Sequence, residues 1–250
     1  MPPGSDCLRR LRTIASSADE KVPADTLTIV TARNEAERIG ATLAALARSL
    51  PGVPVMLADD GSSDATAEIA SEAGARVLRG GRAIGKGGAA TLAARAALQE
   101  LGPGSGEEAV VLFCDGDLGD SAARLAALVH AVRAGEADVA VAAFSRRLGG
   151  GFGVAVAFAR WAIRRRCGLR AAAPISGQRA LRADVLNDVL PFAAGFGMEL
   201  AMTIDAVRAG YRVVEVELDL AHRASGRTPA GFVHRARQLR DFARVYIARR

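Results

Sequence analysis

Apolar stretches of strand length alternate with longer amphipathic stretches over the first half of the chain, and this alternation constrains the fold more than any other feature. Buried strands are indicated by TLTIVTA at 26–32, VPVMLAD at 53–59, ARVLRG at 75–80 and EEAVVLFCD at 107–115. Helical periodicity fills the segments between them, at 34–50, 63–74 and 86–101. Strands separated by helices of this length run parallel, so we predict an α/β fold with a mainly parallel central sheet flanked by helices.

The second half of the chain continues the pattern less regularly. Helices are predicted at 152–166, 198–210 and 232–250, and strands at 137–144 and 211–223. The segment ISGQRALRADVL at 175–186 indicates a strand or turn followed by a short helix. With neither an internal repeat nor a linker, we expect an N-terminal arm at 1–24 and a single domain at 25–250.

Composition and charge argue against several classes of protein. The formal net charge is +6, but aromatic residues make up only 4% of the chain, which argues against nucleic-acid binding because base stacking needs exposed aromatic rings. No apolar run approaches the roughly 20 residues that span a bilayer, and no signal peptide is evident. Three cysteines without metal-ligand spacing indicate reduced thiols. We therefore expect a soluble, cytoplasmic protein.

The stretch CDGDLGD at 114–120 places three carboxylates directly after a buried strand. Asp115, Asp117 and Asp120 lie within six positions, and like charges this close destabilise one another unless a cation lies between them. Asp120 is also placed to cap the helix that follows. Because ligands of parallel sheets bind at the carboxyl ends of the strands, a cation bound by these carboxylates is one hypothesis, and three solvated turn acids are the alternative.

Two further polar stretches follow the first and second strands, TARNEAE at 31–37 and ADDGSSDAT at 58–66. Each is weak alone, since Asp-Gly-Ser is common in turns and Asn34 is placed to cap a helix. Together with the Gly-Lys-Gly at 85–87 and the Asp-x-Asp at 115–117, they form an ordered set. With this set the chain resembles the family 2 type of nucleotide-sugar-dependent glycosyltransferases, which have the glycosyltransferase-A (GT-A) fold, Rossmann-like in its sheet.

The resemblance assigns roles to residues in the first half, and implies a nucleotide-sugar-binding half at 25–120 and an acceptor-binding half at 121–250. Asp115 and Asp117 match the Asp-x-Asp motif, with Gly116 between them, which implies Mg²⁺ or Mn²⁺ held between carboxylates and the donor diphosphate. Lys86 would clamp that diphosphate. The nucleoside base and ribose would contact the residues Thr31, Ala32, Arg33, Glu35, Asp60 and Gly61. Uracil is the expected base, and UDP-glucose the expected donor.

GGRAIGKGG at 80–88 nearly matches the P-loop pattern G-x-x-x-x-G-K-[ST], so a P-loop and an ordinary solvated loop are the two alternatives for this segment. Gly87 stands where a P-loop needs a hydroxyl for magnesium, and the segment follows the third strand rather than the first. A glycine-rich helix start with one lysine still suits a diphosphate.

The second half resembles two subfamilies. PFAAGFGMELAMTIDAVRAGYRVVEVELDLAHR at 191–223 is similar to glucosyl-3-phosphoglycerate synthases, which implies Glu199 and Asp117 as catalytic carboxylates and His222 as a third metal ligand. ISGQRAL at 175–181 is more similar to polyprenyl-phosphate sugar synthases. GGGFG at 149–153 departs from the acceptor loop of the first subfamily, although arginines remain available for a phosphate or as surface charge: Arg146, Arg147, Arg179, Arg223 and Arg227.

These features predict a metal-dependent transfer of a sugar from a nucleoside diphosphate sugar to a phosphorylated acceptor such as 3-phosphoglycerate. A polyprenyl phosphate at the membrane surface is the alternative acceptor, because FGVAVAFARWAIRRR and the basic final helix suit peripheral membrane contact, although core packing and solvation explain them too. The sequence leaves open whether the chain forms a homodimer. A nucleotidyltransferase is disfavoured, because TARNEAE has no glycine-rich phosphate loop, and a sugar-nucleotide-binding protein without transferase activity is the remaining rival.

Overall fold

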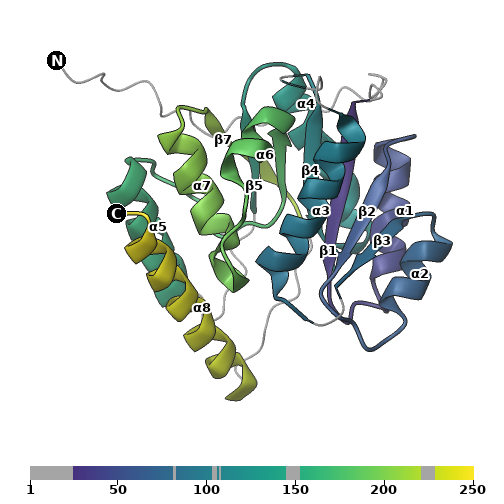
Figure 1. The fold of residues 1–250 in the computed structure, drawn as a ribbon, viewed down its shortest axis with the longest axis horizontal. Helices are drawn as coiled ribbons and strands as arrows, with labels where there is room; N and C mark the ends of the chain where they lie inside the picture. The colour runs from purple at the N-terminus through teal and green to yellow at the C-terminus, as the bar shows by residue number, and fades with distance from the viewer. Residues whose placement is uncertain (1–24, 81–82, 103–105, 107, 145–152, 221–228) are drawn as a thin grey trace.

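The computed structural model describes residues 25–80, 83–102, 106, 108–144, 153–220 and 229–250. Its centre is a seven-stranded sheet in the order β3-β2-β1-β4-β6-β5-β7 (Figure 1). The strands are β1 (Thr26–Ala32), β2 (Val55–Asp59), β3 (Arg76–Arg79), β4 (Val110–Asp115), β5 (Val139–Phe144), β6 (Arg179–Arg182) and β7 (Val213–Leu218). β6 is antiparallel to β4 and β5, and the other neighbours pair in parallel. The predicted α/β fold with a mainly parallel sheet is confirmed.

Helices cover both faces of this sheet (Figure 1). They are α1 (Ile39–Ser49), α2 (Thr66–Glu72), α3 (Lys86–Leu101), α4 (Ala126–Arg133), α5 (Gly153–Cys167), α6 (Ala183–Val189), α7 (Met198–Arg208) and α8 (Pro229–Ala248), with 3-10 turns η1 (Gly119–Leu125) and η2 (Gly195–Gly197). One apolar core lies between the sheet and α1, α2 and α4, and the second lies between the sheet and α3, α6 and α7. Central strands such as β1 and β4 are buried along their length, as strands covered on both faces must be.

The structure changes three local predictions. The helix predicted from residue 34 begins at Ile39, because Asn34 has a φ of 57°, which interrupts a right-handed helix. The alternative that Asn34 caps this helix is wrong, since the helix start has no side-chain cap. Asp120 does not cap the helix that follows either, because its carboxylate lies 2.9 Å from Arg48 Nη2 and no side chain caps η1.

Strand register brings the polar segments together. Thr31 of β1 pairs with Ala58 of β2 on one side and with Asp115 of β4 on the other. The three polar stretches therefore begin at the same edge of the sheet, as expected for parallel strands.

Candidate active site

A cavity of about 520 Å³ lies at the carboxyl ends of β1, β2 and β4. Among the residues predicted for the site, those that line the cavity are Thr31, Ala32, Arg33, Glu35, Asp60, Lys86, Asp115, Gly116 and Asp117. Phe196 of η2 and Arg237 of α8 also line it, and neither was predicted from the sequence. The structure thus assembles most of the predicted donor residues around one cavity.

Lys86 joins the two halves of the site. Lys86 is the first residue of α3. Its Nζ lies 2.7 Å from Asp115 Oδ1 and 2.8 Å from Glu199 Oε1. Glu199 is in the first turn of α7, as predicted, and its side chain is only 8% exposed. In the described structure the carboxylate cluster therefore has a cation supplied by the chain itself.

Asp115 and Lys86 each stabilise the charged form of the other. Burial alone would raise the pKa of Asp115, but the Lys86 ammonium and the hydrogen bonds from Lys86, Thr31 and Gln178 outweigh burial and hold that pKa below its ordinary value. Burial likewise opposes the charge of Lys86, and Asp115 and Glu199 overcome it and raise the Lys86 pKa. Both groups are consequently ionised at neutral pH.

Asp115 has little capacity left for a further ligand. Its Oδ1 accepts a hydrogen bond from Thr31 Oγ1 at 3.0 Å as well as the contact from Lys86, and its Oδ2 accepts one from Gln178 Nε2 at 2.7 Å. Each oxygen is thus engaged by the protein. A metal ion at Asp115 would have to share or displace these donors.

Asp117 has no such partners. Its side chain is partly exposed at the cavity and makes no hydrogen bond or ion pair with the part of the chain that the structure describes. Its backbone is held, because the Asp117 carbonyl accepts a hydrogen bond from Arg38 Nη1 at 3.1 Å and the Gly116 carbonyl accepts one from Thr42 Oγ1 at 2.9 Å. Asp117 is therefore the carboxylate that is held in place and open to a ligand.

Asp60 anchors the loop that leads into α3. Its Oδ1 accepts the backbone N–H groups of Ile84 and Gly85 at 2.8 and 2.7 Å, and its Oδ2 lies 3.8 Å from Arg33 Nη1. Gly61, which does not line the cavity, has a φ of 75°, a conformation that favours glycine. Asp60 thus links the second strand end to the start of the helix that carries Lys86.

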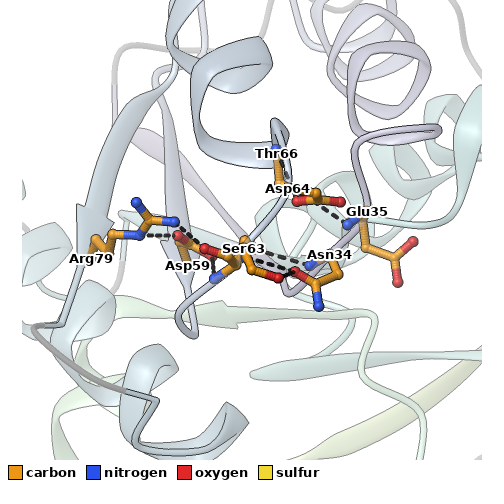
Figure 2. A network of polar contacts seen from close by, with 8 residues as sticks. Asn34, Glu35, Asp59, Ser63, Asp64, Thr66 and Arg79 are labelled. Atoms are coloured by element: carbon orange, nitrogen blue, oxygen red, sulfur yellow. Dashed lines mark hydrogen bonds and ion pairs between the residues drawn. The ribbon is translucent and has the colours of Figure 1, made fainter.

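A polar network joins the first two loops of the site (Figure 2). The side chain of Asn34 accepts the N–H of Ser63 at 2.8 Å, and the N–H of Glu35 donates to Thr66 Oγ1 at 2.8 Å. Asp59 is buried and lies 2.6 Å from Arg79 Nε. The neighbouring acids Asp59 and Asp60 therefore differ in role, because Asp59 braces the loop and Asp60 faces the cavity.

Two glycines of the site lie where an added Cβ would come close to other atoms. A Cβ on Gly87 would lie 2.0 Å from the carbonyl oxygen of Ala193, so the serine or threonine of a P-loop has no room here. A Cβ on Gly177 would lie 2.7 Å from Asp115 Oδ2 and 2.8 Å from Lys86 Nζ. The first glycine serves backbone packing, and the second makes room for the charged cluster.

The segment ISGQR at 175–179 contacts the charged cluster of Lys86, Asp115 and Glu199 through a hydrogen bond to Asp115. Besides the bond from Gln178 to Asp115, Ser176 Oγ donates to Gln178 Oε1 at 3.1 Å, which orients the amide. Arg179 is 1% exposed and bonds to the Ser176 carbonyl and to Thr203 Oγ1, so it is not surface charge. Burial lowers the pKa of Arg179 to about 10. Sequence reasoning missed Gln178, since a single amide beside a strand carries no recognisable signal.

Several predicted residues lie outside the described part of the chain. These are His222, the predicted third metal ligand, together with Arg146, Arg147, Arg223 and Arg227.

Within the described ranges no group of three or more histidine, cysteine, aspartate or glutamate side chains is arranged to hold a metal ion. Among the same residues, no helix has both the length and the apolar character that crossing a membrane requires.

Solved structures share this fold. The chain is 25% identical to the glucosyl-3-phosphoglycerate synthase of Mycobacterium tuberculosis in complex with Mn²⁺, UDP and glucosyl-3-phosphoglycerate, with a TM-score of 0.70 over 90% of this chain and 79% of that one. A complex of that synthase with Mn²⁺ and UDP-glucose gives 26% identity and a TM-score of 0.68 over 88% and 78%. The protein is thus a glycosyltransferase with the GT-A fold.

Sequence comparison specifies the family. The model of glycosyl transferase family 2 matches residues 28–190, and the chain belongs to this family. It is also similar to the undecaprenyl-phosphate mannosyltransferase of Micrococcus luteus, with 32% identity over 216 residues that cover 80% of this chain and 85% of that protein. The predicted resemblances to glucosyl-3-phosphoglycerate synthases and to polyprenyl-phosphate sugar synthases are both confirmed.

Proposed function

We propose that this glycosyltransferase transfers a hexose, with glucose as the first candidate, from a UDP-sugar to a phosphorylated acceptor, with the help of Mg²⁺ or Mn²⁺. The observation that carries the proposal is the cavity in which Asp117 is open, Lys86 is charged and Asp60 holds the loop before α3. The solved complexes of the similar synthase contain Mn²⁺ and UDP or UDP-glucose, which supports the same donor here.

Asp117 is the residue proposed to hold the cation, since its oxygens have no other partner among the described residues. A hard divalent ion suits carboxylate and diphosphate oxygens, and when bound it stabilises the charge that develops on the departing UDP. His222 remains the proposed third ligand. The predicted role of Asp115 as a direct ligand is kept as a proposal, and its three protein contacts favour a role in positioning Lys86 and Gln178.

Lys86 is proposed to bind the donor diphosphate. It stands at the N-terminus of the 16-residue helix α3, where helix-end N–H groups already favour an anion. Its contact with Glu199 puts that carboxylate next to the reacting region, which suits a residue that positions or activates the acceptor. The base and ribose are proposed to lie against Thr31, Ala32, Arg33, Glu35 and Asp60.

A thermal-shift screen tests the donor assignment. UDP, GDP and ADP sugars are compared with and without manganese, and only UDP sugars with manganese are expected to raise the melting temperature. Stabilisation by a bound ligand grows with its concentration above the dissociation constant, so a titration separates specific binding from salt effects. Equal shifts with all three nucleotides would reject uracil as the recognised base.

A polyprenyl phosphate is the second candidate acceptor. The observation that favours it is the 32% identity to the undecaprenyl-phosphate mannosyltransferase over most of both chains. Transfer from a labelled UDP-sugar to 3-phosphoglycerate in buffer, and to undecaprenyl phosphate in detergent, distinguishes the two. Donor binding without transfer to either would favour the sugar-nucleotide-binding alternative.

A further inference from the structure

The pair of helices α5 and α8 forms an outer layer of the molecule, with α7 packed against both (Figure 1). A small apolar core between these three helices buries one side of α5, including Ala159, Ala162 and Ile163. The opposite side of α5 faces away from the protein. This outward side is unusual in composition.

Apolar side chains lie along the outward side of α5. Val154, Ala157 and Trp161 are spaced by three and four residues, which places them on one helical face, and all three are exposed. Val154 is 72% and Trp161 50% exposed, so two large apolar side chains of this helix face solvent. An exposed tryptophan is more typical of an interface than of a solvated surface.

Trp161 is held by neighbouring rings. Its ring centroid lies 4.7 Å from that of Tyr246 of α8 and 5.5 Å from that of Phe158, and the Arg166 guanidinium lies 3.7 Å above the Tyr246 ring. The indole is therefore supported on one side and open on the other. Little rotamer entropy remains to be lost when a partner covers it.

All charged side chains of α5 are positive. The helix carries Arg160, Arg164, Arg165 and Arg166 and contains no acidic residue. The side chains of Arg164 and Arg165 are exposed and form no ion pair with the described part of the chain. A partner that matches both properties must be anionic and must also accept apolar side chains.

We propose that the α5–α8 face, defined by Val154, Ala157, Trp161, Arg164, Arg165 and Tyr246, binds an anionic lipid surface. Arginines at the headgroup level and a tryptophan at the boundary of the acyl chains are the features by which an amphipathic helix lies on a bilayer. α8 also contributes Arg237 to the cavity, so the face and the site share a helix. The inference goes beyond the proposed function and does not depend on transfer.

Trp161 provides its own probe, because it is the only tryptophan in the chain. The full chain is mixed with vesicles of phosphatidylglycerol and phosphatidylcholine or with pure phosphatidylcholine. The expected result is a blue shift of tryptophan emission and quenching by brominated acyl chains with the anionic vesicles alone, reversed by high salt. No shift and no co-sedimentation with anionic vesicles at low salt would overturn the proposal.

Variants locate the contact. Arg164→Gln combined with Arg165→Gln is expected to weaken binding to anionic vesicles by about thirtyfold, since each arginine near such a surface contributes about 1 kcal/mol. Trp161→Ala is expected to weaken it about fivefold through lost apolar burial. The matched controls are Arg48→Gln with Arg95→Gln on α1 and α3, and Leu92→Ala on α3, whose side chain is 46% exposed. Equal weakening by the controls would contradict this face.

A second copy of the chain is the competing occupant. Light scattering combined with tryptophan emission in the absence of lipid tests it. A dimer whose formation shields Trp161 would assign the face to self-association and overturn the lipid proposal. A monomer with solvent-exposed Trp161 emission, together with quenching on anionic vesicles, supports it. Donor binding is measured separately, so failure here leaves the proposed function untouched.

Discussion

The ammonium of Lys86 lies 2.7 Å from Oδ1 of Asp115, so the chain itself supplies one cation to the acidic strand end. The same ammonium contacts Glu199, which lies 84 residues beyond Asp115 in the sequence. Lys86 thus pairs with Asp115 and Glu199, whereas the carboxylate charge of Asp117 has no ion-pair partner among the described residues. A divalent cation near Asp117 would balance this charge, which is the physical basis of the proposed metal dependence.

Stability should depend on pH through Asp115. Its pKa in the folded protein is below the unfolded value of about 3.9, so it stabilises the fold above that pH, and the stabilisation is lost as pH falls through the folded pKa. We expect the difference in unfolding free energy between wild type and Asp115→Asn to shrink below about pH 5. Denaturant melts from pH 7 downwards measure it.

Asp120→Asn is the control for this experiment. The Asp120 carboxylate is 85% exposed and, among the described residues, pairs with the exposed Arg48, so its removal should change stability little at any pH. A difference for Asp115→Asn that stays constant with pH would contradict the ion pair with Lys86. The sequence alone suggested that removing Asp115 relieves repulsion, and the structure corrects this, because Asp115 is paired.

Lys86→Met should weaken binding of UDP in the presence of Mn²⁺ by about 1.5 to 3 kcal/mol, the range for a charged hydrogen bond. It should also lower the melting temperature at pH 7, since it leaves Asp115 and Glu199 without their shared cation. Calorimetry measures the affinity. Arg95→Met, on the exposed side of the same helix, should leave affinity unchanged. Equal affinity for Lys86→Met and wild type would remove Lys86 from the donor site.

Gly177→Ala should reduce donor affinity more than stability. The added methyl group would lie within 3 Å of the ends of two side chains, Asp115 and Lys86, which can move aside but then leave their present geometry. Gly87→Ala should instead destabilise the fold, because its methyl group would meet the backbone oxygen of Ala193. Gly40→Ala in α1 meets only ordinary contacts and serves as the control. Melting temperatures and UDP titrations of the three variants provide the test, and similar profiles for Gly177→Ala and Gly40→Ala would refute the steric argument.

The parts of the site that follow strands could be predicted from the sequence, because parallel strands end at one edge and their last residues must meet there. Asp60, Asp115 and Asp117 were found this way, and Lys86 was found through the resemblance of its Gly-Lys-Gly to the family's motif. Contacts that cross between distant elements could not be predicted. The bond from Gln178 to Asp115 depends on β6 entering the sheet antiparallel beside β4, and the sequence left that segment open between strand and turn.

The central claim is that donor binding depends on a divalent cation held by Asp117, and calorimetry of UDP binding tests it most directly. Wild type should bind UDP with Mn²⁺ present and lose most of that affinity in EDTA. Asp117→Asn should bind UDP weakly in both conditions while melting at the wild-type temperature, because the Asp117 side chain makes no hydrogen bond or ion pair with the described residues. UDP affinity that is the same in EDTA as in Mn²⁺, or unchanged by Asp117→Asn, would contradict the account.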